Sequence, residues 1–157
     1  RHGIVNSNIH TKIKNGLRDS ICLVSIENLD FHYRPKENDD YVCPDVMVIC
    51  DRKHLRGGSY EGVPRLIVET LSPSTAKRDK TVKKDIYEKA GVEEYWIVSP
   101  QGMIDIYYLK NGSYELEFSY MLQNDTKNSD YNAHQEICLR AFPHIKMTLE
   151  DIFEGVY

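Results

Sequence analysis

The alternation of apolar and polar positions along the chain predicts a short series of helices and strands. Ile9, Ile13 and Leu17 recur every four residues, which is the spacing of one helix stripe, so we expect a helix over residues 5–17. Apolar runs bounded by charged or turn residues favour strands, which we place at residues 21–33, 45–50, 65–71, 94–98 and 136–142. Residues 148–153 predict a short terminal turn.

Turn residues separate these segments at two informative places. Asn111-Gly112 lies between apolar segments at residues 103–109 and 113–122, which predicts a β-hairpin. A helix is expected over residues 74–91, with Ser74 or Thr75 at its start and Gly91 just past its end. The strand–helix–strand order followed by a hairpin predicts one α/β or α+β domain over residues 1–157, with a mixed central sheet.

Composition and charge narrow the class of protein. The chain has 157 residues, 41% hydrophobic and 28% charged, which suits a soluble domain with a real core. Its formal net charge of −4 disfavours a protein that coats duplex DNA, although a local basic patch stays open. No apolar run is long enough to span a bilayer. Because the chain begins with Arg1, we expect that some N-terminal residues are missing.

Cysteine usage predicts the redox compartment. The four cysteines stand at positions 22, 43, 50 and 138, and none forms a C-x-x-C pair that would suggest a zinc site. Their density is far below that of a disulfide scaffold. We therefore expect reduced thiols and a cytoplasmic location.

Two carboxylates stand where apolar residues would be expected. Asp45 opens an apolar strand directly after Pro44, and Glu69 interrupts the run "RLIVETL" on the same face as Ile67 and Leu71. Asp45 alone is consistent with a turn, and Glu69 with a half-exposed edge strand. Together on neighbouring strands they would form an oxygen site suited to Mg²⁺ or Mn²⁺.

Lys83, on the following predicted helix, is a third candidate for the same site. With 100° per residue from Val82, Lys83 falls inside the apolar arc, beside Tyr87 and one turn from Asp79. Lys80 and Lys84 fall toward solvent. An inward lysine needs a partner or a use, so Lys83 either pairs with Asp79, extends its ammonium to solvent, or acts on water or charge at a metal site.

At these residues the chain resembles the restriction-endonuclease-like domain family of the PD-(D/E)XK nuclease superfamily. The resemblance runs from about Pro44 to Pro100, through "PDVMVI", "GVPRLIVETLSPST" and "RDKTVKKDIYEKAGVEEYWIVSP". It implies a central mixed sheet flanked by helices, with Asp45 and Glu69 as the two acids. Leu71 stands where the superfamily has its lysine, and Lys83 would take that role from the next helix.

The resemblance further implies magnesium-dependent hydrolysis of DNA phosphodiester bonds, with the backbone carbonyl of Thr70 as an additional metal ligand. Basic residues beside the site are either a solvated face or phosphate contacts; they are Lys77, Arg78, Lys80 and Lys84. His2, Asp79 and Tyr87 are further candidates near the site, and His2 is the only histidine that we do not assign to a structural or surface role.

These patterns predict a Mg²⁺- or Mn²⁺-dependent DNA endonuclease in which Asp45 and Glu69 bind the metal and Lys83 positions water. The net charge and the missing E-x-K motif leave a second class open, a catalytically inactive nucleic-acid-binding or protein-interaction module on the same fold. A homodimer that pairs through the hairpin at Asn111-Gly112 is a weaker alternative.

Overall fold

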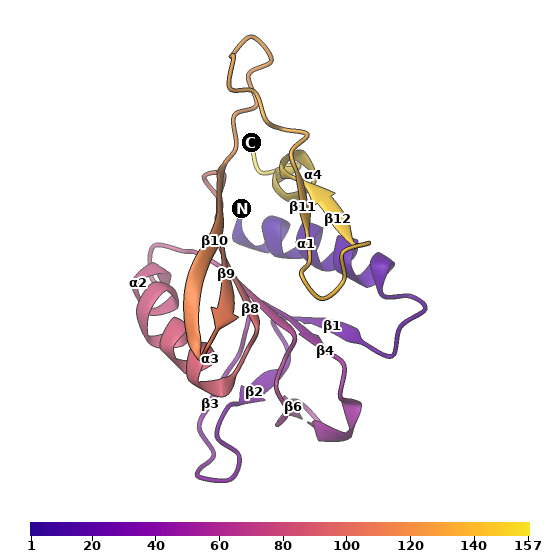
Figure 1. The fold of residues 1–157 in the computed structure, drawn as a ribbon, viewed down its shortest axis with the longest axis vertical. Coiled ribbons are helices and arrows are strands. Elements are labelled where there is room, and N and C mark those ends of the chain that lie inside the picture. The colour runs from indigo at the N-terminus through magenta and orange to yellow at the C-terminus, as the bar shows by residue number, and fades with distance from the viewer.

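The computed structural model describes residues 1–157 as a mixed central sheet between two groups of helices (Figure 1). The first half of the chain contains the elements α1 (His2–Gly16), β1 (Leu23–Ile26), β2 (Asp30–His32), β3 (Tyr41–Val42), β4 (Val46–Ile49), η1 (Arg52–His54), β5 (Leu55–Arg56), β6 (Ser59–Tyr60) and β7 (Leu66–Thr70). The second half contains α2 (Ala76–Arg78), the π-helical turn η2 (Asp79–Lys83), α3 (Lys84–Ala90), β8 (Glu94–Ser99), β9 (Met103–Lys110), β10 (Ser113–Met121), β11 (Glu136–Cys138), β12 (Lys146–Thr148) and α4 (Leu149–Phe153).

The central sheet has six strands in the order β1-β4-β7-β8-β9-β10, and only β7 and β8 run parallel. A parallel pair needs a crossover, which α2, η2 and α3 supply on one face of the sheet. Strands β2, β3, β5 and β6 form a separate small sheet, and β11 pairs with β12. The predicted fold class, a mixed central sheet with flanking helices, is confirmed.

Two apolar clusters fill the spaces on either side of the sheet. One packs α1, α4 and the β11–β12 pair against alternate strand residues such as Val46 and Val68, and the other packs α3 against Met47 and Ile67. In Figure 1, α1 and α4 accordingly lie across the sheet from α2 and α3. No helix has the length and apolar character that crossing a membrane requires.

The local signals proved reliable at the turns. Asn111 and Gly112 both have positive φ angles, 53° and 80°, and join β9 to β10 as the hairpin signal predicts. Gly91 adopts the left-handed conformation that ends α3. Thr75 rather than Ser74 takes the N-cap position of α2, and its side chain caps no backbone N–H of that helix.

Two strand predictions were wrong in extent. Residues 21–33 do not form one strand, because Glu27 turns with a φ of 50° and sends β1 and β2 into different sheets. The strand expected at residues 136–142 ends at Cys138. Residues 148–153 form a capped helix rather than a simple turn, since the side chains of Thr148 and Asp151 complete a capping box.

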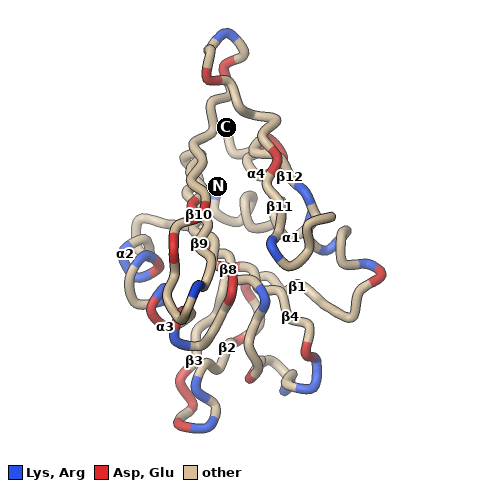
Figure 2. The backbone as a smooth tube through the Cα atoms, in the orientation of Figure 1, with Lys and Arg blue, Asp and Glu red and all other residues tan.

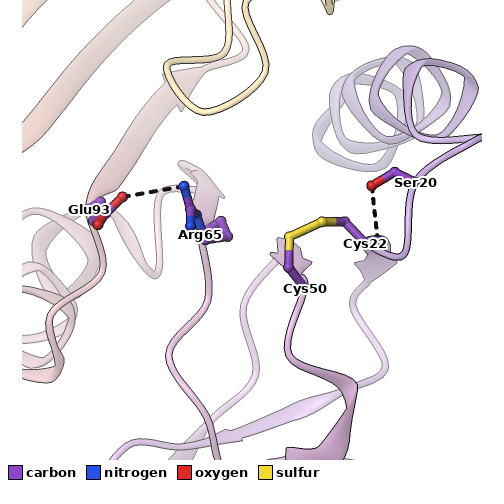
Figure 3. Close-up of a disulfide and its surroundings, with 5 residues drawn as sticks. All are labelled: Ser20, Cys22, Cys50, Arg65 and Glu93. Atoms are coloured by element: carbon purple, nitrogen blue, oxygen red, sulfur yellow. Dashed lines mark hydrogen bonds and ion pairs between the residues drawn. A yellow bond between two sulfur atoms is a disulfide. The ribbon is translucent and has the colours of Figure 1, made fainter.

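The expectation of reduced thiols was wrong for two of the four cysteines. Leu23 pairs with Ile49 across β1 and β4, and this register places Cys22 opposite Cys50, where a disulfide joins them. Figure 3 shows this bond, with the backbone N–H of Cys22 donating to Ser20 Oγ at 3.1 Å. Cys43 and Cys138 remain free thiols. The pairing depends on strand register, which cysteine spacing does not reveal.

Candidate metal and catalytic site

The two carboxylates singled out in the sequence come from neighbouring central strands. Val46 pairs with Val68 across β4 and β7, and one further residue along this antiparallel register Asp45 stands opposite Glu69. Both side chains therefore share a face of the sheet. Strand β7 lies between β4 and β8, so the alternative of an exposed edge strand for Glu69 was wrong.

Glu69 is 1% exposed and makes two contacts through the same oxygen. The hydroxyl of Tyr87 donates to Oε1 at 2.5 Å, and the ammonium of Lys83 lies 3.0 Å from it. The other oxygen, Oε2, is buried without a hydrogen-bond partner. Burial raises the pKa of Glu69 to about 8, against the opposing attraction of Lys83. The protein thus holds a desolvated carboxylate with one unused oxygen.

Lys83 lies at the last position of the π-helical turn η2, and its side chain is only 14% exposed. Its Nζ lies 3.0 Å from Glu69 Oε1 and 3.2 Å from Asp79 Oδ1. Burial lowers the pKa of Lys83, but attraction to these two carboxylates outweighs it, and the pKa is raised. A lysine in this state is a cation and a hydrogen-bond donor, so Lys83 is better suited to orient water or balance charge than to take a proton from water.

The regular helical wheel explains only part of this arrangement. It correctly placed Lys83, Tyr87 and Asp79 on the inner side, and Tyr87 and Asp79 are almost fully buried. It was wrong for Val82, from which the wheel was counted and which lies at one edge of the expected apolar arc, because Val82 is 53% exposed. The π-helical turn changes the angular advance between residues 79 and 83, so a constant 100° step does not hold there.

Asp45 is oriented by two donors that meet at one oxygen. The backbone N–H of Thr70 donates to Oδ2 at 2.7 Å, and His2 Nε2 lies 3.1 Å from the same atom. Burial raises the pKa of Asp45, opposed by the Thr70 hydrogen bond and by His2. Because the N–H and C=O of a strand residue point the same way, the Thr70 carbonyl faces the Asp45 side of β7. Its role as a metal ligand stays a prediction.

Sequence reasoning missed Glu27. Ligand atoms of His2, Glu27 and Asp45 all lie within 4.8 Å of one another, which makes this group a candidate for holding a metal ion. The backbone N–H of Glu27 donates to the Asp45 carbonyl at 2.9 Å, at the end of the β1–β4 ladder. The prediction of a continuous strand at residues 21–33 hid the turn that brings Glu27 to this place.

The basic residues proposed for phosphate contact divide into two sets. Lys77, Arg78 and Lys80 are exposed on α2 and η2, where Figure 2 shows basic residues at the start of this helical segment. The ammonium of Lys84 instead lies 3.9 Å from the centre of the Tyr107 ring. Elsewhere along the backbone in Figure 2, Lys and Arg positions alternate with Asp and Glu positions.

A surface cavity of about 590 Å³ lies between residues 33–37 and α3, and none of the site carboxylates lines it. The arrangement around Asp45 and Glu69 is therefore identified by its chemistry and not by its volume. It brings together three acids and one cation within mostly desolvated surroundings: Asp45, Glu69, Asp79 and Lys83. The pKa values of Asp45, Glu69 and Lys83 are all shifted, and a group of residues with shifted pKa values is typical of functional sites.

Comparison with known proteins gives three results. A family model described as "Putative restriction endonuclease" matches residues 1–138. An uncharacterized protein of Synechocystis sp. is 31% identical over 109 residues, which cover 68% of this chain and 56% of that protein. This chain thus spans little more than half the length of that relative.

The third result concerns solved structures. A crystal structure from Anabaena variabilis, titled as a putative nuclease belonging to DUF820, matches with a TM-score of 0.71 and 15% identity. The match covers 99% of this chain and 82% of that chain. At this level of identity the likeness establishes a shared fold.

Proposed function

Because this chain belongs to the Uma2 family of putative restriction endonucleases, we propose that it is a metal-dependent nuclease that hydrolyses DNA phosphodiester bonds. The observation that carries this proposal is the convergence of Asp45, Glu69 and Lys83 from three different elements. Acids on adjacent strands with a nearby buried cation would provide metal ligands and charge stabilisation at one place.

The residues present fit a hard divalent cation. Glu69 Oε2 is buried without a partner, and no hydrogen bond of the protein reaches Asp45 Oδ1. These two oxygens are free to act as ligands, with the Thr70 carbonyl as a third donor, and all-oxygen ligand sets suit Mg²⁺ or Mn²⁺. When bound, the cation would supply an activated water and stabilise negative charge on the phosphate.

The chain's own residues would then have separate tasks. Asp45 and Glu69 hold the metal, while the Lys83 ammonium positions the attacking water or balances the charge that develops on the phosphate. Tyr87 and Asp79 support this by fixing Glu69 and Lys83. Exposed Lys77, Arg78 and Lys80, with Lys84, would contact neighbouring phosphates.

The test is cleavage of plasmid and single-stranded DNA with Mn²⁺ or Mg²⁺, comparing wild type with Asp45→Asn, Glu69→Gln and Lys83→Ala. Each change should reduce cleavage at least a hundredfold, in line with the loss of one electrostatic contributor. Two matched variants should keep activity. Glu94→Gln changes a buried carboxylate on β8 that contacts Trp96 instead, and Lys89→Ala removes an exposed lysine of α3 paired with Asp85.

A non-catalytic module on the same fold is the alternative. Lys83 already neutralises Glu69 and Asp79 without a metal, which would suit a purely structural ion-pair network. Such a module would show no increase in melting temperature with Mg²⁺ or Mn²⁺ and no cleavage that depends on Asp45. Metal stabilisation that Asp45→Asn abolishes would instead support the nuclease.

A further inference from the structure

The start of α1 reaches Asp45 through a chain of partly buried polar contacts. Asn6 is fully buried, and its Nδ2 lies 3.3 Å from His2 Nδ1 and donates to Glu27 Oε1. His2 in turn places Nε2 3.1 Å from Asp45 Oδ2. A fully buried asparagine is uncommon, and its contacts here lead to one candidate metal ligand.

The contacts of Asn6 determine how His2 presents its ring. A carboxylate oxygen can only accept, so Asn6 must direct its amide N–H₂ toward Glu27, and the same group then donates to His2 Nδ1. With Nδ1 as an acceptor, the proton of the neutral ring is on Nε2, which is the atom facing Asp45. His2 is thereby oriented as a donor to Asp45.

The consequence is an asymmetric carboxylate at Asp45. Oδ2 receives two donors, the Thr70 N–H at 2.7 Å and His2 Nε2 at 3.1 Å, whereas no hydrogen bond of the protein reaches Oδ1. A carboxylate anchored through one oxygen cannot rotate freely, and its other oxygen keeps a fixed direction. Partners of this kind orient metal ligands, and their loss typically costs 10- to 100-fold in metal affinity or activity.

We propose that Asn6 and His2 are positioning residues that anchor Asp45 Oδ2 and so leave Oδ1 directed at the divalent cation. This inference rests on the proposed metal-dependent function. It assigns a role to α1, an element that lies outside the strand–helix–strand unit carrying Glu69 and Lys83. In this arrangement His2 donates to Asp45 and is not a metal ligand, although it belongs to the His2–Glu27–Asp45 group described above. Loss of His2 or Asn6 should therefore weaken metal binding without removing the site formed by Asp45 and Glu69.

The experiment follows the rise in melting temperature as Mn²⁺ is added to the whole chain, each variant being compared with itself in EDTA. This metal-dependent increment separates metal affinity from any loss of stability that a buried substitution causes. The variants are His2→Ala, His2→Gln and Asn6→Ala. The matched controls are Asn8→Ala, whose side chain binds carbonyls of Ile152 and Glu154, and His10→Gln on the same helix.

We expect His2→Ala and Asn6→Ala to shift the half-saturating Mn²⁺ concentration upward at least tenfold, with a matching fall in cleavage at low Mn²⁺. His2→Gln should restore affinity to within about threefold, because the glutamine amide can donate from nearly the position of Nε2. The two controls should bind Mn²⁺ like wild type.

Three outcomes would overturn the inference. Unchanged Mn²⁺ affinity in both alanine variants would show that Asp45 needs no anchor. Complete loss of the response in both His2 variants would make His2 a ligand. Failure of His2→Gln to recover any affinity would also contradict a donor role. The proposed function fails separately, if wild type itself shows neither a Mn²⁺ response nor cleavage.

Discussion

Replacing Lys83 by methionine would leave two buried carboxylates, those of Glu69 and Asp79, without the cation they share. The ammonium lies 3.0 and 3.2 Å from them, and each carboxylate is 1% exposed. Methionine keeps much of the side-chain volume, so the change removes chiefly charge. Breaking a buried ion pair by removing one partner costs about 3–5 kcal/mol. In a domain of this length that corresponds to a loss of roughly 6–20 °C in melting temperature.

The cost should depend on pH in a defined direction. Lys83 opposes the burial that raises the pKa of Glu69 to about 8, so its removal raises that pKa further. At pH 6 Glu69 of the variant stays protonated, so no unpaired charge is buried. At pH 9 the folded variant must either bury a charged Glu69 or bind a proton that the unfolded chain does not bind, and both lower its stability. We therefore expect the larger loss of unfolding free energy at pH 9.

The assay is urea denaturation in EDTA at pH 6 and pH 9. Lys89→Met is the control, because Lys89 forms an exposed pair with Asp85 whose loss should cost less than about 0.5 kcal/mol. Adding Glu69→Gln to Lys83→Met should restore at least about 1 kcal/mol of unfolding free energy at pH 9, because it removes one of the two unpaired buried charges. If Lys83→Met costs less than about 1 kcal/mol at pH 9, or costs the same at both pH values, Lys83 does not neutralise these carboxylates as described.

Three further outcomes are expected. The folded pKa of Glu69, about 8, exceeds the usual value of 4.5, so in EDTA its stabilising contribution is present at low pH and is lost as the pH rises through 8. In urea denaturation, Glu69→Gln should flatten this decline of the unfolding free energy with pH. Reducing the Cys22–Cys50 disulfide, which closes a loop with a sequence separation of 28, should lower the unfolding free energy by about 3–4 kcal/mol in denaturation with and without dithiothreitol. Gly16→Ala should lower the melting temperature, because a β-carbon there collides with a buried isoleucine and overpacking costs about 1–3 kcal/mol. Gly3→Ala on the same helix meets open space and should not lower the melting temperature.

Much of the site was predictable because its signals are local. Glu69 stands out in the sequence as one charge in a β-branched run, and the structure buries it on a central strand. The four-residue spacing of Asp79 and Lys83 is a helix pairing that survives even in a π-helical turn. The raised pKa of Lys83 was not predictable, because two carboxylates outweigh burial only at their actual distances.

Other parts of the site had no local signal. In the sequence Glu27 looks like an ordinary residue of an amphipathic segment. Its positive φ angle and its position at the end of the β1–β4 ladder, which only the fold shows, bring it beside Asp45. The buried contacts of Asn6 depend on how α1 packs across the sheet. The disulfide likewise needed the β1–β4 register, which fixes the distance between two cysteines that sequence spacing leaves open.

Local sequence signals were enough to predict most of the helices and strands, the hairpin at Asn111-Gly112, the end of α3 at Gly91 and the acids and lysine worth attention. These features follow from periodicity, turn chemistry and the cost of burying charge, all of which act over a few neighbouring residues. Which oxygen of Asp45 is anchored, and which groups surround Glu69, could be seen only in the assembled fold. Those contacts join residues far apart in the chain, and their energies depend on register, packing and desolvation that exist only once the sheet and its helices have assembled.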